Sequence, residues 1–145
     1  KVQVDFSQIN DGDFTGIGVL QGDYAFIAAT KNNGKNQIVI ATRKSEQELY
    51  KIGQVDKDEV QIIWQTQIQE NKIIFRENFD FSLNADFVGF EYKNISSENW
   101  NKIDFRKKLK FGLDHFTGAR IALFYYSTKI TGGKSIFSNF KFIKE

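Results

Sequence analysis

Residue types that can do chemistry are scarce in this chain of 145 residues. It has no cysteine and one histidine, which excludes disulfides, thiolate metal sites, cysteine nucleophiles and histidine-rich zinc sites. The histidine stands in the pair Asp114 and His115, which could act as a general base near neutral pH. The same pair could instead fix a loop before the strand expected from Ala119, and we favour this structural role.

Oxygen-bearing side chains crowd one short segment. Asn10, Asp11 and Asp13 surround Gly12, and calcium is bound by oxygen atoms from loops of this kind. Three side chains fall short of the six to eight oxygens that calcium takes, and the spacing does not match an EF-hand. We therefore predict a plain turn and no metal or cofactor, with calcium left as an unsupported possibility.

Aromatic side chains form a third group of candidates. In the strand expected at 119–128, alternation puts Arg120, Phe124 and Tyr126 on one face, and Ile121, Leu123 and Tyr125 on the core face. An arginine beside exposed aromatic rings suits a sugar, whose apolar ring faces stack on aromatics and whose hydroxyls need polar partners. Tyr24 is a further stacking candidate. For any single ring, packing in the core is the simpler interpretation, and we expect it for Trp64, together with Val60 and Ile62, and for Trp100.

The elements that would position these residues are short strands. The composition is rich in phenylalanine and isoleucine, which favour strands, and no segment shows sustained helical periodicity. Strands are predicted at residues 2–6, 14–21, 24–30, 37–43, 60–68, 71–77, 87–93, 119–128 and 135–143, with a return strand from Trp100. Residues 44–59 could form a helical turn or a polar strand. This spacing predicts a single all-β domain, an antiparallel β-sandwich of the jelly-roll kind.

Two details of the pairing also follow from the pattern. The strands at 60–68 and 71–77 are expected to pair across the turn at Gln69 and Glu70. The strands at 119–128 and 135–143 are apolar on both faces, so we expect them to lie centrally in their sheets, with their extra aromatics against a ligand, a loop or a partner.

Composition limits the classes of partner. The 20 basic and 18 acidic residues are interspersed and give a net charge of +2, so nothing favours nucleic acid, and the run Arg106 to Lys108 is read as a solvated loop or edge. No run of about 18 apolar residues predicts a membrane span, and no signal segment is visible. The sequence is compatible with a bacterial cytoplasm, a periplasm or secretion.

The C-terminal third carries a pattern that resembles a known family. It reads GFEYKNISSENW at 89–100 and LDHFTGARIALFYYSTKITGGKSIFSNFKF at 113–142, and INDGDFTGIGVLQGDYAFIA at 9–28 looks like an early hairpin of the same family. Together these segments resemble the concanavalin A-like C-terminal domain of family 43 glycoside hydrolases, the β-xylosidase and α-L-arabinofuranosidase group. The chain departs from the family at Ile136 and Ser138, where many relatives carry acidic residues.

The resemblance implies an accessory role. It implies a concanavalin A-like β-sandwich packed on a catalytic β-propeller, and a chain, 1–145, that is a C-terminal fragment of a larger glycoside hydrolase. Xylan or arabinoxylan would be the ligand. The substrate-binding residues that we then expect are Arg120, Tyr126, Phe124, His115, Asp114 and Tyr24.

Two alternatives differ from this expectation. One is a purely structural docking module with no affinity for sugar. The other is an independent sandwich hydrolase, which is the weakest because the E-x-D-x-x-E strand signature of such enzymes is missing: Glu91 has no acidic residue two positions on. We therefore assign no catalytic residue to this chain.

Overall fold

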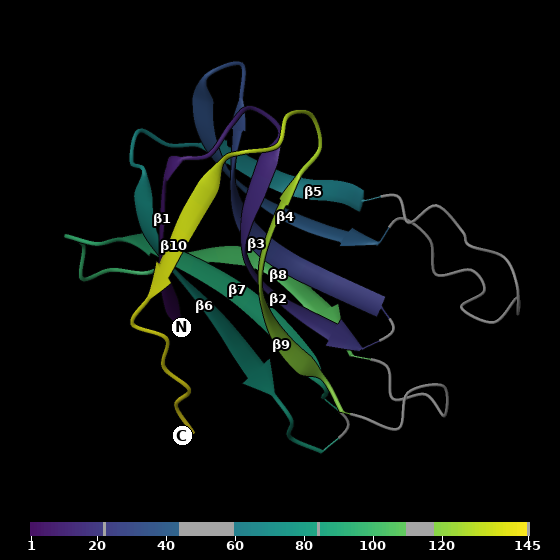
Figure 1. The fold of residues 1–145 in the computed structure, drawn as a ribbon. Helices are drawn as coiled ribbons and strands as arrows, with labels where there is room; N and C mark the ends of the chain where they lie inside the picture. The colour runs from purple at the N-terminus through teal and green to yellow at the C-terminus, as the bar shows by residue number, and fades with distance from the viewer. Residues whose placement is uncertain (22, 44–59, 84, 110–117, 145) are drawn as a thin grey trace, which may run out of the picture.

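The computed structural model describes residues 1–21, 23–43, 60–83, 85–109 and 118–144 as two β-sheets that face each other (Figure 1). Each sheet has five antiparallel strands. The described residues form no helix, and therefore none that is long and apolar enough to cross a membrane. The predicted antiparallel β-sandwich is confirmed.

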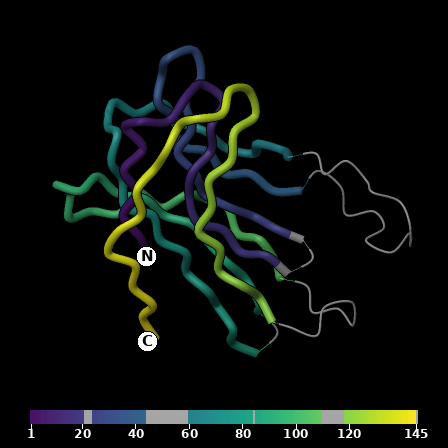
Figure 2. Tube along the Cα trace, in the orientation of Figure 1, coloured from purple at the N-terminus to yellow at the C-terminus, as the bar shows by residue number. Residues whose placement is uncertain are grey.

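The two sheets draw strands from both halves of the chain. In order across the first sheet lie β10 (Lys134–Ser138), β1 (Val2–Gln8), β6 (Lys72–Asp80), β7 (Phe87–Asn94) and β8 (Asn101–Lys108). In order across the second lie β5 (Val60–Gln67), β4 (Lys35–Arg43), β3 (Asp23–Asn32), β2 (Asp13–Gln21) and β9 (Arg120–Ser127). The trace in Figure 2 shows how the last strand returns beside the first, which brings the two ends of the chain to the same side of the molecule.

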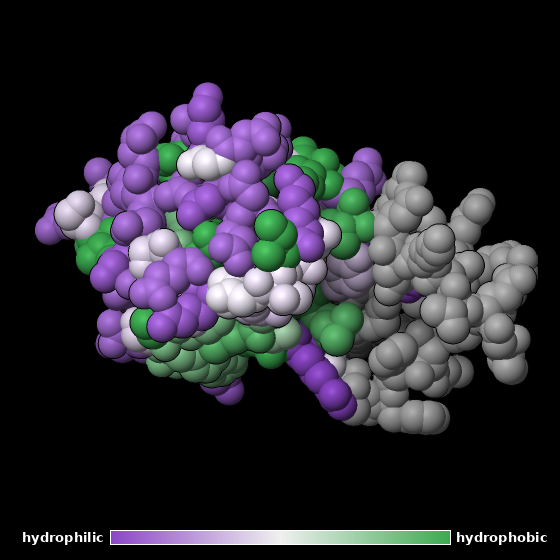
Figure 3. Space-filling view, turned by 45° about the horizontal axis from the view of Figure 1, so that its top comes forward, coloured by the Kyte–Doolittle hydropathy of each residue, from purple (hydrophilic) through white to green (hydrophobic). Residues whose placement is uncertain are grey.

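The main core lies between the sheets because alternate residues of each strand point inward. The first sheet contributes Val2, Val4, Phe6, Ile73, Phe75, Val88 and Phe90, and the second contributes Ile17, Val19, Ala25, Ile27, Ile38 and Ile40. All of these side chains are essentially inaccessible to water. The face in view in Figure 3 is mostly hydrophilic, with single hydrophobic residues scattered over it and a continuous hydrophobic band along its lower border.

The predicted hairpins are confirmed where a short turn joins neighbours, as between β2 and β3 and between β7 and β8. The predicted pairing of the segments at 60–68 and 71–77 is wrong. β5 pairs with β4 in one sheet and β6 pairs with β1 and β7 in the other, so the turn between them crosses from sheet to sheet. Both strands offer apolar residues to the same core, which alternation alone cannot distinguish from a hairpin.

The prediction of two central apolar strands is also wrong. β9 and β10 are the outermost strands of their sheets. At the edge of the sandwich an inward position is only partly covered, and Leu123 on β9 is 42% exposed although Ile121 and Tyr125 on the same face pack against the core. β10 ends at Ser138, because Asn139 takes a left-handed conformation with φ of 53°.

The two tryptophans lie in different surroundings. Trp64 packs against the core and Tyr92, as predicted, but it does not share a face with its neighbour Ile62, which is 43% exposed. A bulge in β5 opposite Ile40 and Ala41 inserts one residue and reverses the alternation between them. Trp100, predicted to fill the core, instead lies outside the first sheet, with its ring against the guanidinium group of Arg76.

Candidate functional site

The outer side of the second sheet carries a cluster of aromatic rings that we call the aromatic face. Its members are Phe14, Tyr24, Phe26, Phe124 and Tyr126. They come from β2, β3 and β9, whose register places Phe14 opposite Tyr126 and Gly16 opposite Phe124. This cluster is separate from the main core, since the same strands send the alternate residues inward.

Small side chains make the floor on which these rings lie. Ala28, Val39 and Ala41 are fully buried in the middle of the face. Gly18 on β2 faces Phe26, and a Cβ added there would lie 2.8 Å from the Cβ of Phe26. The glycine thus leaves the space that the ring of Phe26 occupies, which is a reason for a glycine inside a strand.

The rings pack on one another in two ways. Phe14 and Tyr126 stack with centroids 5.0 Å apart and planes 8° apart, whereas Phe26 meets Phe124 edge to face at 4.8 Å. Burial raises the pKa of Tyr126 to about 12, and Tyr24 nearby adds to the effect, so the Tyr126 hydroxyl keeps its proton at ordinary pH. The face therefore offers apolar rings together with neutral hydroxyl groups, a combination suited to a neutral polyhydroxylated ligand.

The segment suspected of holding calcium is a turn fixed by Asp13. This fully buried carboxylate accepts hydrogen bonds from the backbone of Asn10 at 2.6 Å and from the hydroxyl of Tyr125 at 2.6 Å. Burial alone would raise the pKa of Asp13, but hydrogen bonds from Ser127, Tyr125 and Asn10 outweigh it and lower the pKa. The carboxylate thus joins the turn to β9.

Two further oxygens of this turn also accept hydrogen bonds within the fold, whereas the second carboxylate oxygen of Asp13 is buried without a hydrogen-bond partner among the described residues. Asp11 accepts a hydrogen bond from the backbone of Gly34 at 3.0 Å, and Lys31 donates to the carbonyl of Ile9 at 2.9 Å. Nowhere in the described segments do three acidic or histidine side chains gather as a metal site would require. The hydrogen bonds of Asp11 and Asp13 are consistent with the plain turn predicted for this segment.

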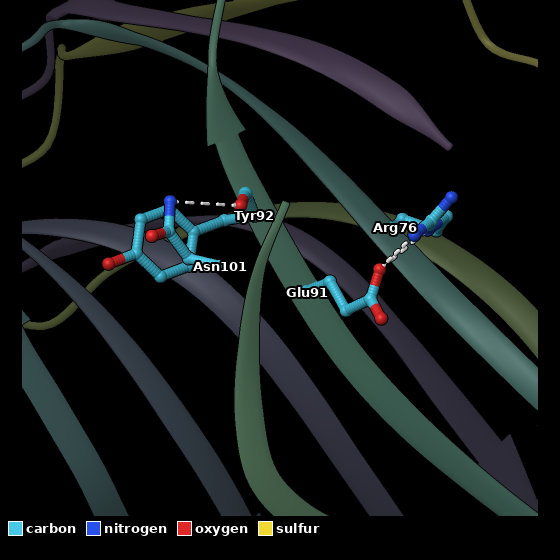
Figure 4. Close-up of polar contacts among 4 residues, drawn as sticks. All are labelled: Arg76, Glu91, Tyr92 and Asn101. Atoms are coloured by element: carbon cyan, nitrogen blue, oxygen red, sulfur yellow. Dashed lines mark hydrogen bonds and ion pairs between the residues drawn. The ribbon is translucent and has the colours of Figure 1, made fainter. Parts of the chain in front are cut away.

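A charged cluster lies on the outer side of the first sheet. Arg76 on β6 and Glu91 on β7 stand opposite each other, and the Nε of Arg76 donates to Glu91 at 2.8 Å (Figure 4). The ring of Trp100 lies 4.0 Å from the same guanidinium group. Glu91 is only 7% exposed, so Arg76 neutralises an almost buried carboxylate.

A contact from a side chain to the backbone joins β8 to β7 at the residue that follows Glu91. The side-chain amide of Asn101 donates to the carbonyl of Tyr92 at 3.3 Å, beside the Arg76 and Glu91 pair in Figure 4. Neither Arg76 nor Trp100 was assigned to a site from the sequence, because a pair across two strands has no fixed spacing along the chain. The carboxylate of Glu91 is paired with Arg76, and this pairing fits a structural role for Glu91 better than the role of a catalytic acid.

Comparison with protein families decides what this sandwich is. The family model described as the beta xylosidase C-terminal concanavalin A-like domain, of the GH43 group, matches residues 1–143. The chain belongs to this family. A search of curated protein sequences finds no match to the concanavalin A-like domain described here.

Solved structures agree with the family. A bifunctional GH43-CE protein from Bacteroides eggerthii superimposes with a TM-score of 0.78 at 27% identity, over 94% of this domain and 16% of that chain. A GH43 glycoside hydrolase, engineered to display both endo-xylanase and exo-arabinofuranosidase activity, superimposes with a TM-score of 0.75 at 19% identity, over 92% of this domain and 26% of that chain. The concanavalin A-like domain thus spans a small part of each of these proteins.

The predicted binding residues fall into two groups within the domain. Tyr24, Phe124 and Tyr126 are brought together on the aromatic face. Arg120 shares their side of β9, but it stands six residues from Tyr126, about 20 Å along an extended strand. Its neighbour across the sheet is Leu20, which is 47% exposed.

The remaining sequence predictions can be placed in the same way. Asp114 and His115 lie outside the described residues. Phe14 was not among the predicted residues, although it shares its face with Gly16 and Gly18 by alternation and stacks on Tyr126.

Proposed function

We propose that this chain is a non-catalytic accessory domain of a xylan- or arabinan-degrading GH43 glycoside hydrolase, a β-xylosidase or an α-L-arabinofuranosidase, and that it packs beside a catalytic β-propeller. The observation that carries the proposal is the family match over residues 1–143, because the family is described as the C-terminal domain of β-xylosidases. The chain spans only 16% of one GH43 protein of known structure and 26% of another, which supports a partner domain in the same polypeptide.

The carboxylates of the described strands support the non-catalytic part of the proposal. Hydrolysis of a glycosidic bond uses two carboxyl groups that face each other across the bond, about 5 to 10 Å apart. Among the described residues, Glu77 also has buried carboxyl oxygens, but it faces the core, on the opposite side of the first sheet from Glu91. Asp13 and Glu91 are buried as whole residues, and they lie on different sheets. Each is already held by a structural partner, Tyr125 in one case and Arg76 in the other.

A hydrolysis assay and a domain exchange test this role. The purified chain, given aryl β-xylosides, aryl α-L-arabinofuranosides and arabinoxylan, is expected to release no more product than buffer does. Replacing the matching domain of the Bacteroides eggerthii protein by this chain is expected to restore thermal stability that deletion of that domain removes. Hydrolytic activity that co-purifies with the chain would contradict the proposal. A domain-exchanged protein that is no more stable to heat than the domain-deleted protein would contradict it as well.

A second proposal concerns the aromatic face. We propose that it binds xylan-type polysaccharide, with Tyr24, Phe124 and Tyr126 stacking on sugar rings and Arg120 contacting hydroxyl groups at the far end. The spread of about 20 Å between Arg120 and Tyr126 favours a chain of several sugar units over a single sugar. The half-buried rings and the neutral hydroxyl of Tyr126 support this ligand class.

Calorimetric titration with xylo-oligosaccharides and arabinoxylan tests the second proposal. We expect saturable heat from the native chain, and a loss of affinity of about twofold to twelvefold in Tyr126→Ala, since stacking on one ring contributes roughly 0.5 to 1.5 kcal/mol. Lys134→Ala, at an exposed position on β10 in the other sheet, is the matched control and should bind as the native chain does. No heat from the folded chain would leave the docking role alone.

A further inference from the structure

The first sheet has an incomplete edge where β1 begins. β1 pairs with β6 from Asp5 to Val2, and this register puts Lys1 opposite Arg76. β6 continues to Asp80, so Glu77 to Asp80 extend beyond the start of β1. Within the described residues, no strand carries the pairing on along this stretch.

The backbone of this stretch points toward the place that β1 would occupy if it were longer. The amide of Phe6 donates to the carbonyl of Asn71, so Asn71 faces β1. Because backbone groups of successive residues in a strand point to opposite sides, Glu77 and Phe79 face β1 as well. They form an edge with free donors and acceptors, which is the kind of edge that recruits a further strand.

The C-terminal segment forms the opposite wall. Lys1 and Lys141 exchange two backbone hydrogen bonds, of 2.7 and 2.8 Å. In Figures 1 and 2 the C-terminal segment and β6 both run on past the N-terminus, one on each side of it. Since β1 lies between β10 and β6, these two walls stand one strand apart where Lys1 lies between them. The walls carry exposed apolar side chains at Phe81, Phe140 and Phe142.

Glu77 gives this edge a charge preference. It stands at an inward position, after Ile73 and Phe75, and both of its carboxylate oxygens are buried with no hydrogen-bond partner among the described residues. Burial raises its pKa to about 8, and in the part of the chain that the structure describes the α-ammonium of Lys1 is the one group that lowers it. A buried carboxylate without a partner is costly, and a basic side chain beside it would remove that cost.

We propose that the edge of β6 from Glu77 to Asp80 accepts an extended polypeptide segment in line with β1, and that a basic side chain of this segment neutralises Glu77. The occupant is the segment that leads from the catalytic domain into Lys1. This source rests on the proposed function, because the family is C-terminal and its other domains precede it. In the register of β1, the residue directly before Lys1 lies beside Glu77.

Short extensions of the chain test the proposal without a catalytic partner. Three versions carry Thr-Val-Thr-Lys, Thr-Val-Thr-Gln or the flexible Gly-Ser-Gly-Ser before Lys1, each with the native Glu77 and with Glu77→Gln. Urea unfolding measures stability, and amide hydrogen exchange measures protection at Glu77 and Phe79. Every extension moves the α-ammonium group away from Glu77, and the flexible extension measures the effect of that change alone.

We expect the lysine extension to raise the folding equilibrium constant about tenfold or more over the flexible one, and to slow exchange of the Glu77 and Phe79 amides by a similar factor. We expect the lysine extension to exceed the glutamine extension only when Glu77 is present. Equal stability and exchange for all three extensions would overturn the proposal, as would a lysine advantage that persists in Glu77→Gln. Dimers of the unextended chain that protect these amides would also overturn it, because the occupant would then be a second copy. The sugar titration described above tests the aromatic face on the second sheet, so its result does not depend on what the extensions do at the edge of β6.

Discussion

The buried carboxyl of Glu77 predicts a stability that falls as the pH rises. In the folded chain this group has a pKa of about 8, against 4.5 for an ordinary glutamate, because it is removed from water and accepts no hydrogen bond from the described residues, and the α-ammonium of Lys1 offsets only part of this effect. Between these two values the folded state holds a proton that the unfolded state has released. Stability therefore decreases from about pH 4.5 to about pH 8 on account of this group, and Glu77→Gln removes the decrease.

The expected size follows from the two pKa values. The difference between 4.5 and about 8 corresponds to at most about 5 kcal/mol, at about 1.4 kcal/mol for each tenfold change in proton affinity. Glu77→Gln should match the native chain near pH 4.5 and exceed it by several kcal/mol near pH 8.5. Glutamine keeps the shape of the side chain, so packing against β1 and β7 changes little.

Urea unfolding at intervals from pH 4.5 to pH 8.5 measures this difference. Asp104→Asn, which removes an exposed carboxyl on β8, is the control, and its curve should run parallel to that of the native chain. A stability difference between Glu77→Gln and the native chain that does not change with pH would refute the reasoning. It would mean that Glu77 is hydrated or paired in the folded chain.

Three further predictions concern contacts within the fold, all measured by urea unfolding. Tyr125→Phe removes a hydrogen bond to a buried carboxylate and should cost about 1 to 3 kcal/mol, and an unchanged midpoint would contradict this role. Gly16→Ala should lower the free energy of unfolding by about 1 to 3 kcal/mol, because its Cβ would overlap the backbone of β3. Gly89→Ala should lower it less, because the nearest atom to its Cβ, the backbone oxygen of Phe105, would be 3.8 Å away. Arg76→Ala leaves the carboxylate of Glu91 without its partner, so it should lower the free energy of unfolding more in the native chain than in a chain that already carries Glu91→Ala. Equal effects in the two backgrounds would contradict the coupling.

The sequence was informative wherever a local rule applied. Alternation along β9 correctly placed Phe124 and Tyr126 on one face and Ile121 and Tyr125 on the other. Turn residues correctly marked the hairpin between β2 and β3. These features depend on the two-residue period of a strand and on short turns, both of which can be read from neighbouring residues.

What the sequence did not predict depends on contacts between distant residues. The choice between a hairpin and a crossing at Gln69 depends on which sheet has a free edge, and both choices bury the same apolar residues. The bulge that turns Ile62 outward leaves no mark in the alternation of β5. A signal for Glu77 was present, because it takes the inward position that follows Ile73 and Phe75, but the significance of an acid there appears only when its surroundings are known.

The pair of hydrogen bonds between Lys1 and Lys141 has a mechanical consequence. Because β1 and β10 are antiparallel neighbours, a force that separates the two ends of this chain pulls directly across their shared ladder. Such a load breaks hydrogen bonds one after another instead of all at once, so each step needs little force. Under tension the domain should peel open from this corner, with β10 leaving first, while the hairpin of β2 and β3 at the centre of the other sheet stays intact.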